Sequence, residues 1–410
     1  MADDASTPDQ PDRDDGDDGN SPFNPFAAFP MFGDIAKLLQ SQGPLNWDAA
    51  RQFAVLGATH GEPEHNVDPG DRIAFSDLAR IASMHVDDVT GTDAELPEPR
   101  VVTRSQWAAE TLEAYRPLFT DLATSLNQQP GGAEADTDAG GDPMMQMMAG
   151  LSQMMGPAMM GMSVGSMVGQ LSQRVFGLHD LPIPRAKEEI VLVSRNISEF
   201  AGQWEIPIEQ MRLWVLAHET AGLRVFQIDH VRDGLAALVR EHASGFRPDP
   251  STLADSLGDL DAFGSGDDPM QAIQSAFSDP AVLLGAVQSP EQRALQPRLD
   301  AAVAAVVGYT DWVVDAVAAR LIGGEALRIA EAVRRQRAAS TPDDVFVEKL
   351  LGIRVGEDQV RHGKSFVQGV VDRVGESGLN RLLATPGSLP TAAEIEAPGL
   401  WIARVDPDHG

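Results

Sequence analysis

The sequence predicts a mainly α-helical protein, and two observations support this prediction. Apolar residues recur every three to four positions over long stretches, of which residues 208–226 and 290–321 are the clearest. This is the spacing of one face of an α-helix. The chain also lacks the regular alternation of strands and helices that builds a parallel sheet. We therefore expect a multi-helix domain whose helices are joined in places by flexible acidic loops.

The chain is predicted to hold one folded domain, residues 22–405, between two tails. Residues 1–21 are rich in Asp and poor in apolar residues, which indicates a disordered acidic tail, and residues 406–410 form a second short tail. Flexible loops are expected at about 127–142 and 246–290, where Gly, Asp, Ser and Pro are frequent. Besides the two clearest stretches, helices are expected over residues 32–42, 47–56 with Asn46 as N-cap, 72–89, 105–126, 229–242, 325–339, 342–351 and 355–375, and residues 188–193 begin a strand or a helix.

The overall charge and the missing cysteines exclude several classes of protein. The chain has 61 acidic and 31 basic residues, a formal net charge of −30, which argues against binding to nucleic acid or to an anionic membrane. It has no cysteine, so disulfides, thiolate metal sites and a cysteine nucleophile are excluded. The N-terminus lacks the basic and apolar regions of a signal peptide, so we expect a cytoplasmic protein.

One short motif in the helix over residues 208–226 suggests chemistry. Zinc peptidases of the zincin type carry two histidines four residues apart on a helix, so that both imidazoles face one metal ion. A Glu directly after the first His acts as general base for the metal-bound water. Here His218 and Glu219 match the first His and the Glu, whereas Gly222 occupies the position of the second His.

The same residues also have a purely structural interpretation. His218 lies on the apolar face of the predicted helix together with Met211, Trp214 and Val215. A buried histidine on such a face is usually hydrogen-bonded to a neighbour, and a His-Glu pair occurs often by chance. Gly222 costs about 1 kcal/mol relative to Ala in a helix interior, which indicates close packing by another backbone.

Several segments in a fixed order resemble one family, the actinobacterial zincin-like metallopeptidases, which are grouped as zinc-dependent metalloproteases or hydrolases. The resemblance covers most of residues 22–405. Its segments are Asn24-Pro25-Phe26, Met31-Phe32-Gly33, Gly43-Pro44-Leu45-Asn46-Trp47-Asp48, Ile206-Pro207, residues 213–226, Gly308-Tyr309-Thr310-Asp311, Val314-Asp315-Ala316, Arg334-Arg335, Leu351-Gly352 and Leu389-Pro390-Thr391.

The resemblance implies a zincin-like helical fold and a zinc-dependent hydrolase of peptide bonds, with His218 as metal ligand and Glu219 as catalytic base. Two positions depart from the family pattern. Gly222 replaces the second histidine, and Val307 stands where the family has a Glu before the glycine of a later helix. We therefore expect a degenerate zinc site, with either zinc or no metal bound, and an inactive or weakly active enzyme.

Two alternatives stay open at this point. Asp229 and His230 lie just beyond the motif helix and are candidates for replacement ligands. In the second alternative, the chain is a non-catalytic scaffold. It binds a protein or peptide partner through an uncharged, Met-rich segment, residues 143–173. That segment is expected to be a buried helix broken at Pro157, because thioether side chains adapt to irregular packing.

Three further patterns favour structural roles. Gly161-Met162-Ser163-Val164-Gly165 matches the nucleophile elbow of serine hydrolases, but no strand precedes it, so the glycines are predicted to allow close helix packing. Copper(I) binding by the methionines is the less favoured use of the Met-rich segment. The arginine-rich stretch with Arg328, Arg334, Arg335 and Arg337 is expected to be the solvated face of a helix.

Overall fold

The computed structural model describes residues 43–127, 143–246, 289–338, 348, 350–354 and 356–406, and its side chains from Gly156 onward within residues 143–246. Several predictions lie outside the described residues. They are the acidic tail, the helix at 32–42, nearly all of the two loops, most of the helix at 342–351, the methionines before Gly156 and residues 407–410.

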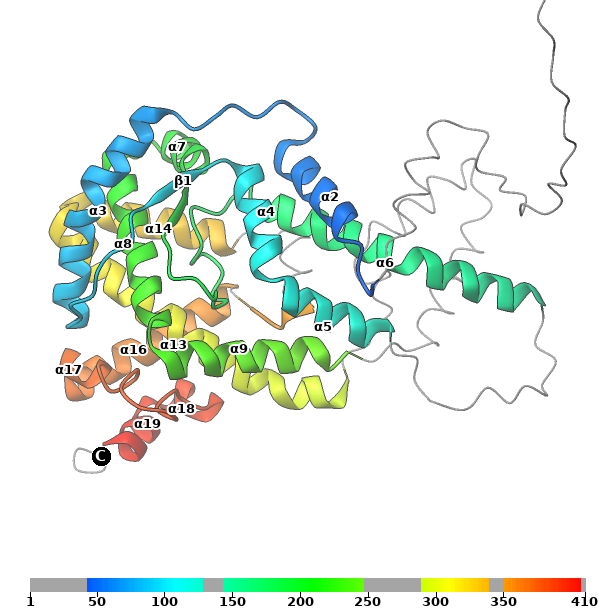
Figure 1. The fold of residues 1–410 in the computed structure, drawn as a ribbon. Coiled ribbons are helices and arrows are strands. Elements are labelled where there is room, and N and C mark those ends of the chain that lie inside the picture. The colour runs from blue at the N-terminus through cyan, green and yellow to red at the C-terminus, as the bar shows by residue number, and fades with distance from the viewer. Residues whose placement is uncertain are drawn as a thin grey trace, which may run out of the picture.

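The prediction of a mainly helical fold is confirmed (Figure 1). The helices are α2 (Trp47–Thr59), α3 (Pro69–Thr90), α4 (Arg104–Ala114), α5 (Arg116–Asn127), α6 (Pro143–Leu171), α7 (Ser194–Gln203), α8 (Ile208–Phe226), α9 (Asp229–Ser244), α13 (Pro290–Leu321), α14 (Ala326–Ala338), α16 (Glu357–Val374), α17 (Glu376–Leu379), α18 (Ala392–Glu396) and α19 (Pro398–Val405). A 3₁₀ turn, Gly323–Glu325, separates α13 from α14. Among the described residues, β1 (Arg100–Val102) and β2 (Val191–Val193) pair in parallel as a two-stranded sheet.

Helices α8 and α13 lie in the centre of the fold, with α3 and α9 beside them (Figure 1). Every residue of α8 from Trp214 to Phe226 is buried, as expected of a helix enclosed by other elements. In the described part of the chain, α13 has the length and hydropathy of a membrane span, but 72% of its most apolar window is buried inside the protein. It is therefore accounted for as a core helix.

The pair α2–α6 shows why small residues recur in α6. A Cβ atom added at Gly161, Gly165 or Gly169 would come within 2.2–2.5 Å of a backbone oxygen of Asn46 or α2. The predicted close packing through these glycines is confirmed. The predicted break at Pro157 is wrong, because α6 is continuous from Pro143 to Leu171. The carbonyl of Pro157 accepts a hydrogen bond from the amide of Asn46, which ties this part of α6 to the start of α2.

The predicted helix over residues 105–126 is two helices, α4 and α5, that meet at Tyr115. Pro117 has no amide hydrogen and cannot bond the carbonyl one turn earlier, which explains the interruption. The N-cap prediction is confirmed at α2, where the Asn46 side chain accepts hydrogen bonds from the amides of Asp48 and Ala49.

Candidate functional site

The three positions that the family resemblance marks as metal ligands lie around one cavity. His218 and Gly222 come from successive turns of α8, and Val307 comes from α13, which packs beside it. The cavity has a volume of about 20 Å³, which is room for about one water molecule. The cavity therefore brings the three positions together, and His218 is the one of the three whose side chain has an atom able to bind a metal.

A loop between α6 and β2 forms the wall of this cavity opposite α8. The loop is held at Gly177, whose carbonyl accepts a hydrogen bond from the indole nitrogen of Trp107. Next to it, the amide of Val193 donates to the carbonyl of Phe176, which joins the loop to the end of β2. These bonds position the following residues, His179 and Asp180, against α8.

Glu219 is fully buried, and residues of the loop surround its carboxylate. Its carboxylate accepts hydrogen bonds from the amides of Leu178 (2.9 Å) and His179 (3.1 Å) and from Nδ1 of His179 (2.9 Å). Burial by itself raises the pKa of Glu219, but the charge and hydrogen bond of His179, with a smaller contribution from the neighbouring His218, outweigh it and hold this pKa well below its usual range. Glu219 is thus a stable anion that binds the loop.

His218 is also buried, and it faces a cation. Its ring stacks on Trp214 with centroids 5.4 Å apart, and its Nε2 atom lies 2.8 Å from Nη2 of Arg337. A guanidinium group only donates hydrogen bonds, so Nε2 of His218 must accept and the ring proton must lie on Nδ1. Nδ1 in turn lies 3.5 Å from the Glu219 carboxylate. Nε2 of His218 is therefore already hydrogen-bonded to a cation.

Arg337 belongs to α14, and the prediction that it lies on a solvated helix face is wrong. Its side chain is only 14% exposed, and its Nη1 atom lies 2.9 Å from Oδ1 of Asp311 on α13. Arg337 follows Ile329 and Val333 at four-residue steps, and both of these are buried. It continues the buried stripe of α14, and that spacing is the signal in the sequence that places its guanidinium inside.

Asp180 adds a second carboxyl group to the cavity wall. Its Oδ2 atom accepts hydrogen bonds from the amides of Phe176 and Gly177, so it closes the turn of the loop. Burial raises the pKa of Asp180, although His218 and Arg337 act in the opposite direction. The group therefore takes up a proton more readily than an exposed Asp.

Gly222 is packed against His179. A Cβ atom at position 222 would lie 2.6 Å from Cβ and Cγ of His179, so the imidazole of the loop fills the space beside this turn of α8. The predicted close packing at Gly222 is present, but the neighbour is the side chain of His179 and not another backbone. Sequence reasoning did not identify His179, because it lies outside any helix and 40 residues away from its partner Glu219.

The two proposed replacement ligands do not reach this cavity. Asp229 and His230 are absent from its lining, and the Asp229 carboxylate, 82% exposed, pairs with Arg232 on the surface of α9. Among the residues that the structure describes, no group of three or more His, Asp or Glu side chains is arranged to hold a metal ion.

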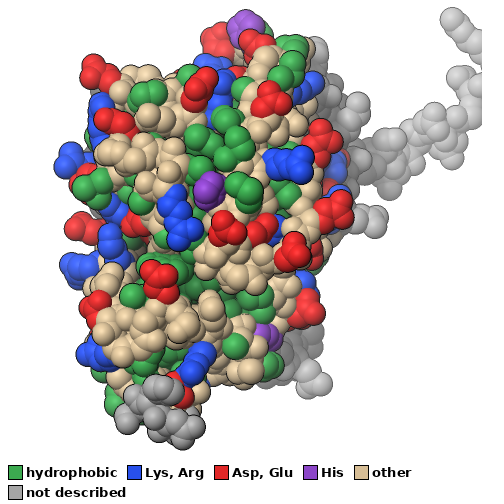
Figure 2. All heavy atoms as spheres, turned by 90° about the vertical axis from the view of Figure 1, so that its left-hand side faces the viewer, with side chains coloured by type: hydrophobic (Ala, Val, Ile, Leu, Met, Phe, Trp, Pro, Cys, Tyr) green, Lys and Arg blue, Asp and Glu red, His purple; other side chains and the backbone are tan. Residues whose placement is uncertain are grey.

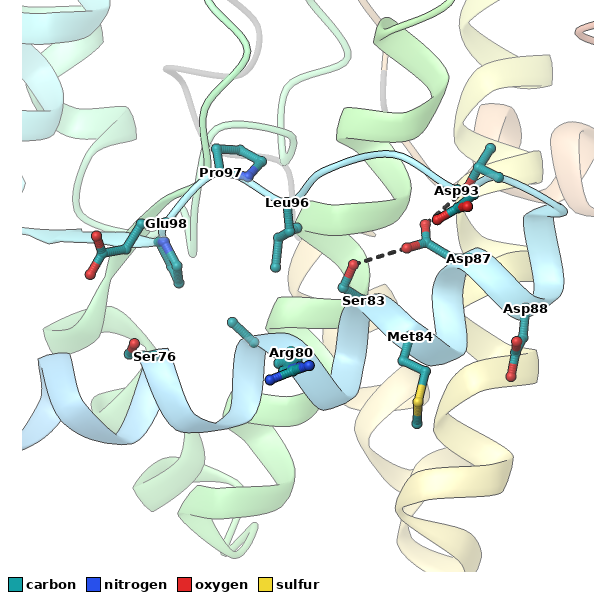
Figure 3. Close-up of a pocket in the computed structure, with 13 residues that line it drawn as sticks. Ser76, Arg80, Ser83, Met84, Asp87, Asp88, Asp93, Leu96, Pro97 and Glu98 are labelled. Atoms are coloured by element: carbon teal, nitrogen blue, oxygen red, sulfur yellow. Dashed lines mark hydrogen bonds between the residues drawn. The ribbon is translucent and has the colours of Figure 1, made fainter.

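A larger groove of about 620 Å³ lies between α3 and residues 92–99, and it shares no lining residue with the cavity at His218. Figure 3 shows Asp87 between Ser83 and the chain near Asp93, with the extended segment passing above α3. Buried Arg224 of α8 donates to both oxygens of Asp87 and to the carbonyl of Ala94. The charge of the Asp87 carboxylate is therefore already neutralised within the protein.

The face with α3 is the one seen in Figure 2, where hydrophobic side chains gather between charged ones. On α3, Ile73, Ile81 and Met84 are exposed. The buried face of this helix is formed by other residues, among them Phe75 and Val86. Isolated apolar side chains of this kind are normal on protein surfaces.

Comparisons with known proteins agree with this architecture. A family model described as zincin-like metallopeptidase matches residues 45–402. The fold is similar to the crystal structure of a "putative hydrolase with a novel fold" from Chloroflexus aurantiacus, with a TM-score of 0.57 and 22% sequence identity over 89% of this chain and 99% of that one. None of the curated proteins compared with the chain matches it.

Proposed function

The chain belongs to the zincin-like metallopeptidase family, and we propose that it is a non-hydrolytic member, in which an arginine stands in the place of the metal ion and the protein acts by binding. The observation that carries this proposal is the 2.8 Å contact between Nη2 of Arg337 and Nε2 of His218. A zinc ion bound to His218 would have to displace this guanidinium.

The donor set at the site does not fit the zinc ion that the family implies. A catalytic zinc ion has three protein ligands and an open position. Here one of the three family positions has a nitrogen donor, His218, while Gly222 has no side chain and Val307 has an apolar one. The side chain that reaches into the cavity instead is the permanent cation of Arg337, which would repel a metal ion.

The state of Glu219 also argues against hydrolysis. A general base works best when its pKa lies near the working pH and when it is within reach of the water that it activates. Glu219 accepts bonds from His179 and two amides, and its pKa is held well below its usual range. A cavity with room for about one water molecule leaves no space for a peptide substrate.

The charged groups around the cavity at His218 are paired within the protein, which supports a role for this protein in binding rather than in hydrolysis. The buried charges of Glu219, Asp311 and Arg337 are all matched by partners, so the former site now contributes to the folded structure. Surfaces away from this site are then the ones available to a ligand or partner.

The test is a measurement of zinc content, by mass spectrometry after incubation with zinc and desalting, together with hydrolysis of fluorescein-labelled casein. Wild type, His218→Ala and the control Arg335→Ala, an exposed arginine on the same helix as Arg337, are expected to hold equally little zinc and to cleave nothing. One zinc ion per wild-type chain that is lost in His218→Ala, with casein cleavage that a chelator stops, would overturn the proposal.

A further inference from the structure

We propose that a pocket between α5, α9 and residues 183–186 binds a small organic oxyanion, a carboxylate or phosphate carried on an apolar body. The pocket has a volume of about 300 Å³ and is separate from the cavity at His218. This volume lies at the lower end of the range for small-molecule sites. The proposal does not depend on whether the protein hydrolyses peptides.

Three arginines line this pocket, in a protein with nearly twice as many acidic as basic residues. Arg185 comes from the loop after α6, and Arg232 and Arg240 come from α9. Asp233 is the one carboxylate among the described residues that line the pocket. Guanidinium groups bind carboxylates and phosphates through paired hydrogen bonds, which makes them the side chains most often used for such ligands.

Arg185 is held in place by uncharged groups. Its Nη2 atom donates to the hydroxyl of Thr111 (2.7 Å), and its guanidinium lies 5.0 Å from the ring centre of Tyr115 and 5.8 Å from that of Trp107. Its Nε atom is buried and has no hydrogen-bond partner among the described residues. A cation held rigidly by neutral groups keeps its charge available to an anionic ligand.

The other two arginines have weak partners. Arg232 pairs with Asp229 and Asp233, whose side chains are 82% and 69% exposed. Arg240 lies 3.4 Å from the carboxylate of Asp121, and both side chains are largely open to solvent. Exposed pairs of this kind contribute little and are screened by salt, so a bound oxyanion can compete for these guanidinium groups.

The rest of the lining supplies an apolar wall. It consists of Tyr115 and of small or aliphatic side chains from the α4–α5 junction, the loop and α9, namely Ala114, Pro117, Leu118, Ile183, Pro184, Ala186, Ala236 and Val239. An apolar wall with a few convergent polar groups is the usual composition of a ligand site. It favours an anion with an apolar body over an inorganic anion.

Isothermal titration calorimetry with phenyl phosphate, benzoate, inorganic phosphate and benzyl alcohol tests the proposal. We expect one site for phenyl phosphate or benzoate, weaker binding of inorganic phosphate and of the neutral alcohol, and a loss of affinity with added salt. Whichever of phenyl phosphate and benzoate binds with the higher affinity shows whether the pocket prefers a phosphate or a carboxylate. Arg185→Gln is expected to weaken its binding about tenfold or more, because a charged hydrogen bond is lost.

The matched control is Arg195→Gln, an exposed arginine on α7 outside this pocket, which should leave the affinity unchanged. Should Arg185→Gln fail to fold, Arg240→Gln on the surface of α9 tests the same site and is also expected to weaken binding. No binding of either aromatic anion at about millimolar concentration, or binding that the pocket variant and the control change equally, overturns the proposal.

Discussion

Nη2 of Arg337 lies 2.8 Å from Nε2 of His218, and Nη1 of the same guanidinium lies 2.9 Å from Oδ1 of Asp311. One side chain of α14 thus joins a buried histidine of α8 to a carboxylate of α13. Helices α8, α13 and α14 therefore meet at the guanidinium group of Arg337.

Removal of this charge should destabilise the fold. We expect Arg337→Ala to lower the free energy of unfolding by roughly 3–5 kcal/mol, because Asp311, whose side chain is 12% exposed, is left as a largely buried anion without its partner. Urea denaturation followed by circular dichroism measures the change. The control Arg335→Ala removes an exposed pair with Glu331 on the same helix and should cost less than about 1 kcal/mol. Equal effects of the two variants would contradict the structural role of Arg337.

Enlargement of Gly222 should be unfavourable although it raises helix propensity. The added Cβ of Gly222→Ala would lie 2.6 Å from His179, which must shift together with its bond to Glu219. We expect a loss of about 1–3 kcal/mol in the free energy of unfolding from this overpacking.

The control for this variant is Gly234→Ala on α9, where an added Cβ meets nothing within 4 Å. This substitution should be neutral or stabilise by up to about 1 kcal/mol, since only the helix propensity changes. Thermal unfolding of both variants measures the difference, and a stabilised Gly222→Ala would show that the loop with His179 moves away at little cost.

The depressed pKa of Glu219 predicts acid sensitivity. The folded-state pKa lies below the unfolded value of about 4.3, so the stability that this group contributes is present above that pH and is lost as the pH falls toward the folded pKa. Glu219→Gln should lower stability at neutral pH by roughly 1.5–3 kcal/mol. It should also flatten the decline in stability that the wild type shows below about pH 5.

Urea unfolding of wild type and variant at several pH values checks this prediction. Glu209→Gln, an exposed position in the first turn of the same helix, serves as control and should follow the wild-type curve. Asp180 acts with the opposite sign, because its raised pKa makes its contribution to stability grow as the pH falls. Because the charge of Glu219 contributes to the raised pKa of Asp180, the difference between wild type and Glu219→Gln at each pH reports the two coupled carboxyl groups together. Parallel curves would contradict the assignment.

Zinc binding should appear when the family's ligands are restored together. The combined variant Arg337→Ala, His179→Ala, Gly222→His and Val307→Glu removes the guanidinium, empties the space beside α8 and supplies two donors around the cavity of His218. We expect it to bind one zinc ion per chain, measured by mass spectrometry, and to lose that ion when His218→Ala is added. A folded variant without zinc would mean that the three positions do not converge closely enough for tetrahedral binding.

The sequence by itself determined the helical architecture and the positions of the candidate site. The apolar spacing of residues 208–226 and 290–321 is visible along the chain, and it predicted α8 and α13 with their observed bounds. The sequence also shows His218 and Glu219, with Gly222 at the position of the second motif histidine and Val307 in the later helix. These features are local, so periodicity and motif comparison suffice to find them.

Only the tertiary structure decided which groups complete the site. His179 reaches Glu219 across 40 residues, and Arg337 reaches His218 across 119. The four-residue spacing of Arg337 from buried Ile329 and Val333 indicates which way its side chain points, but the carboxylate and the histidine that it meets depend on which helices pack against α14. The contact between Arg337 and His218 is therefore a property of the packing of α8, α13 and α14.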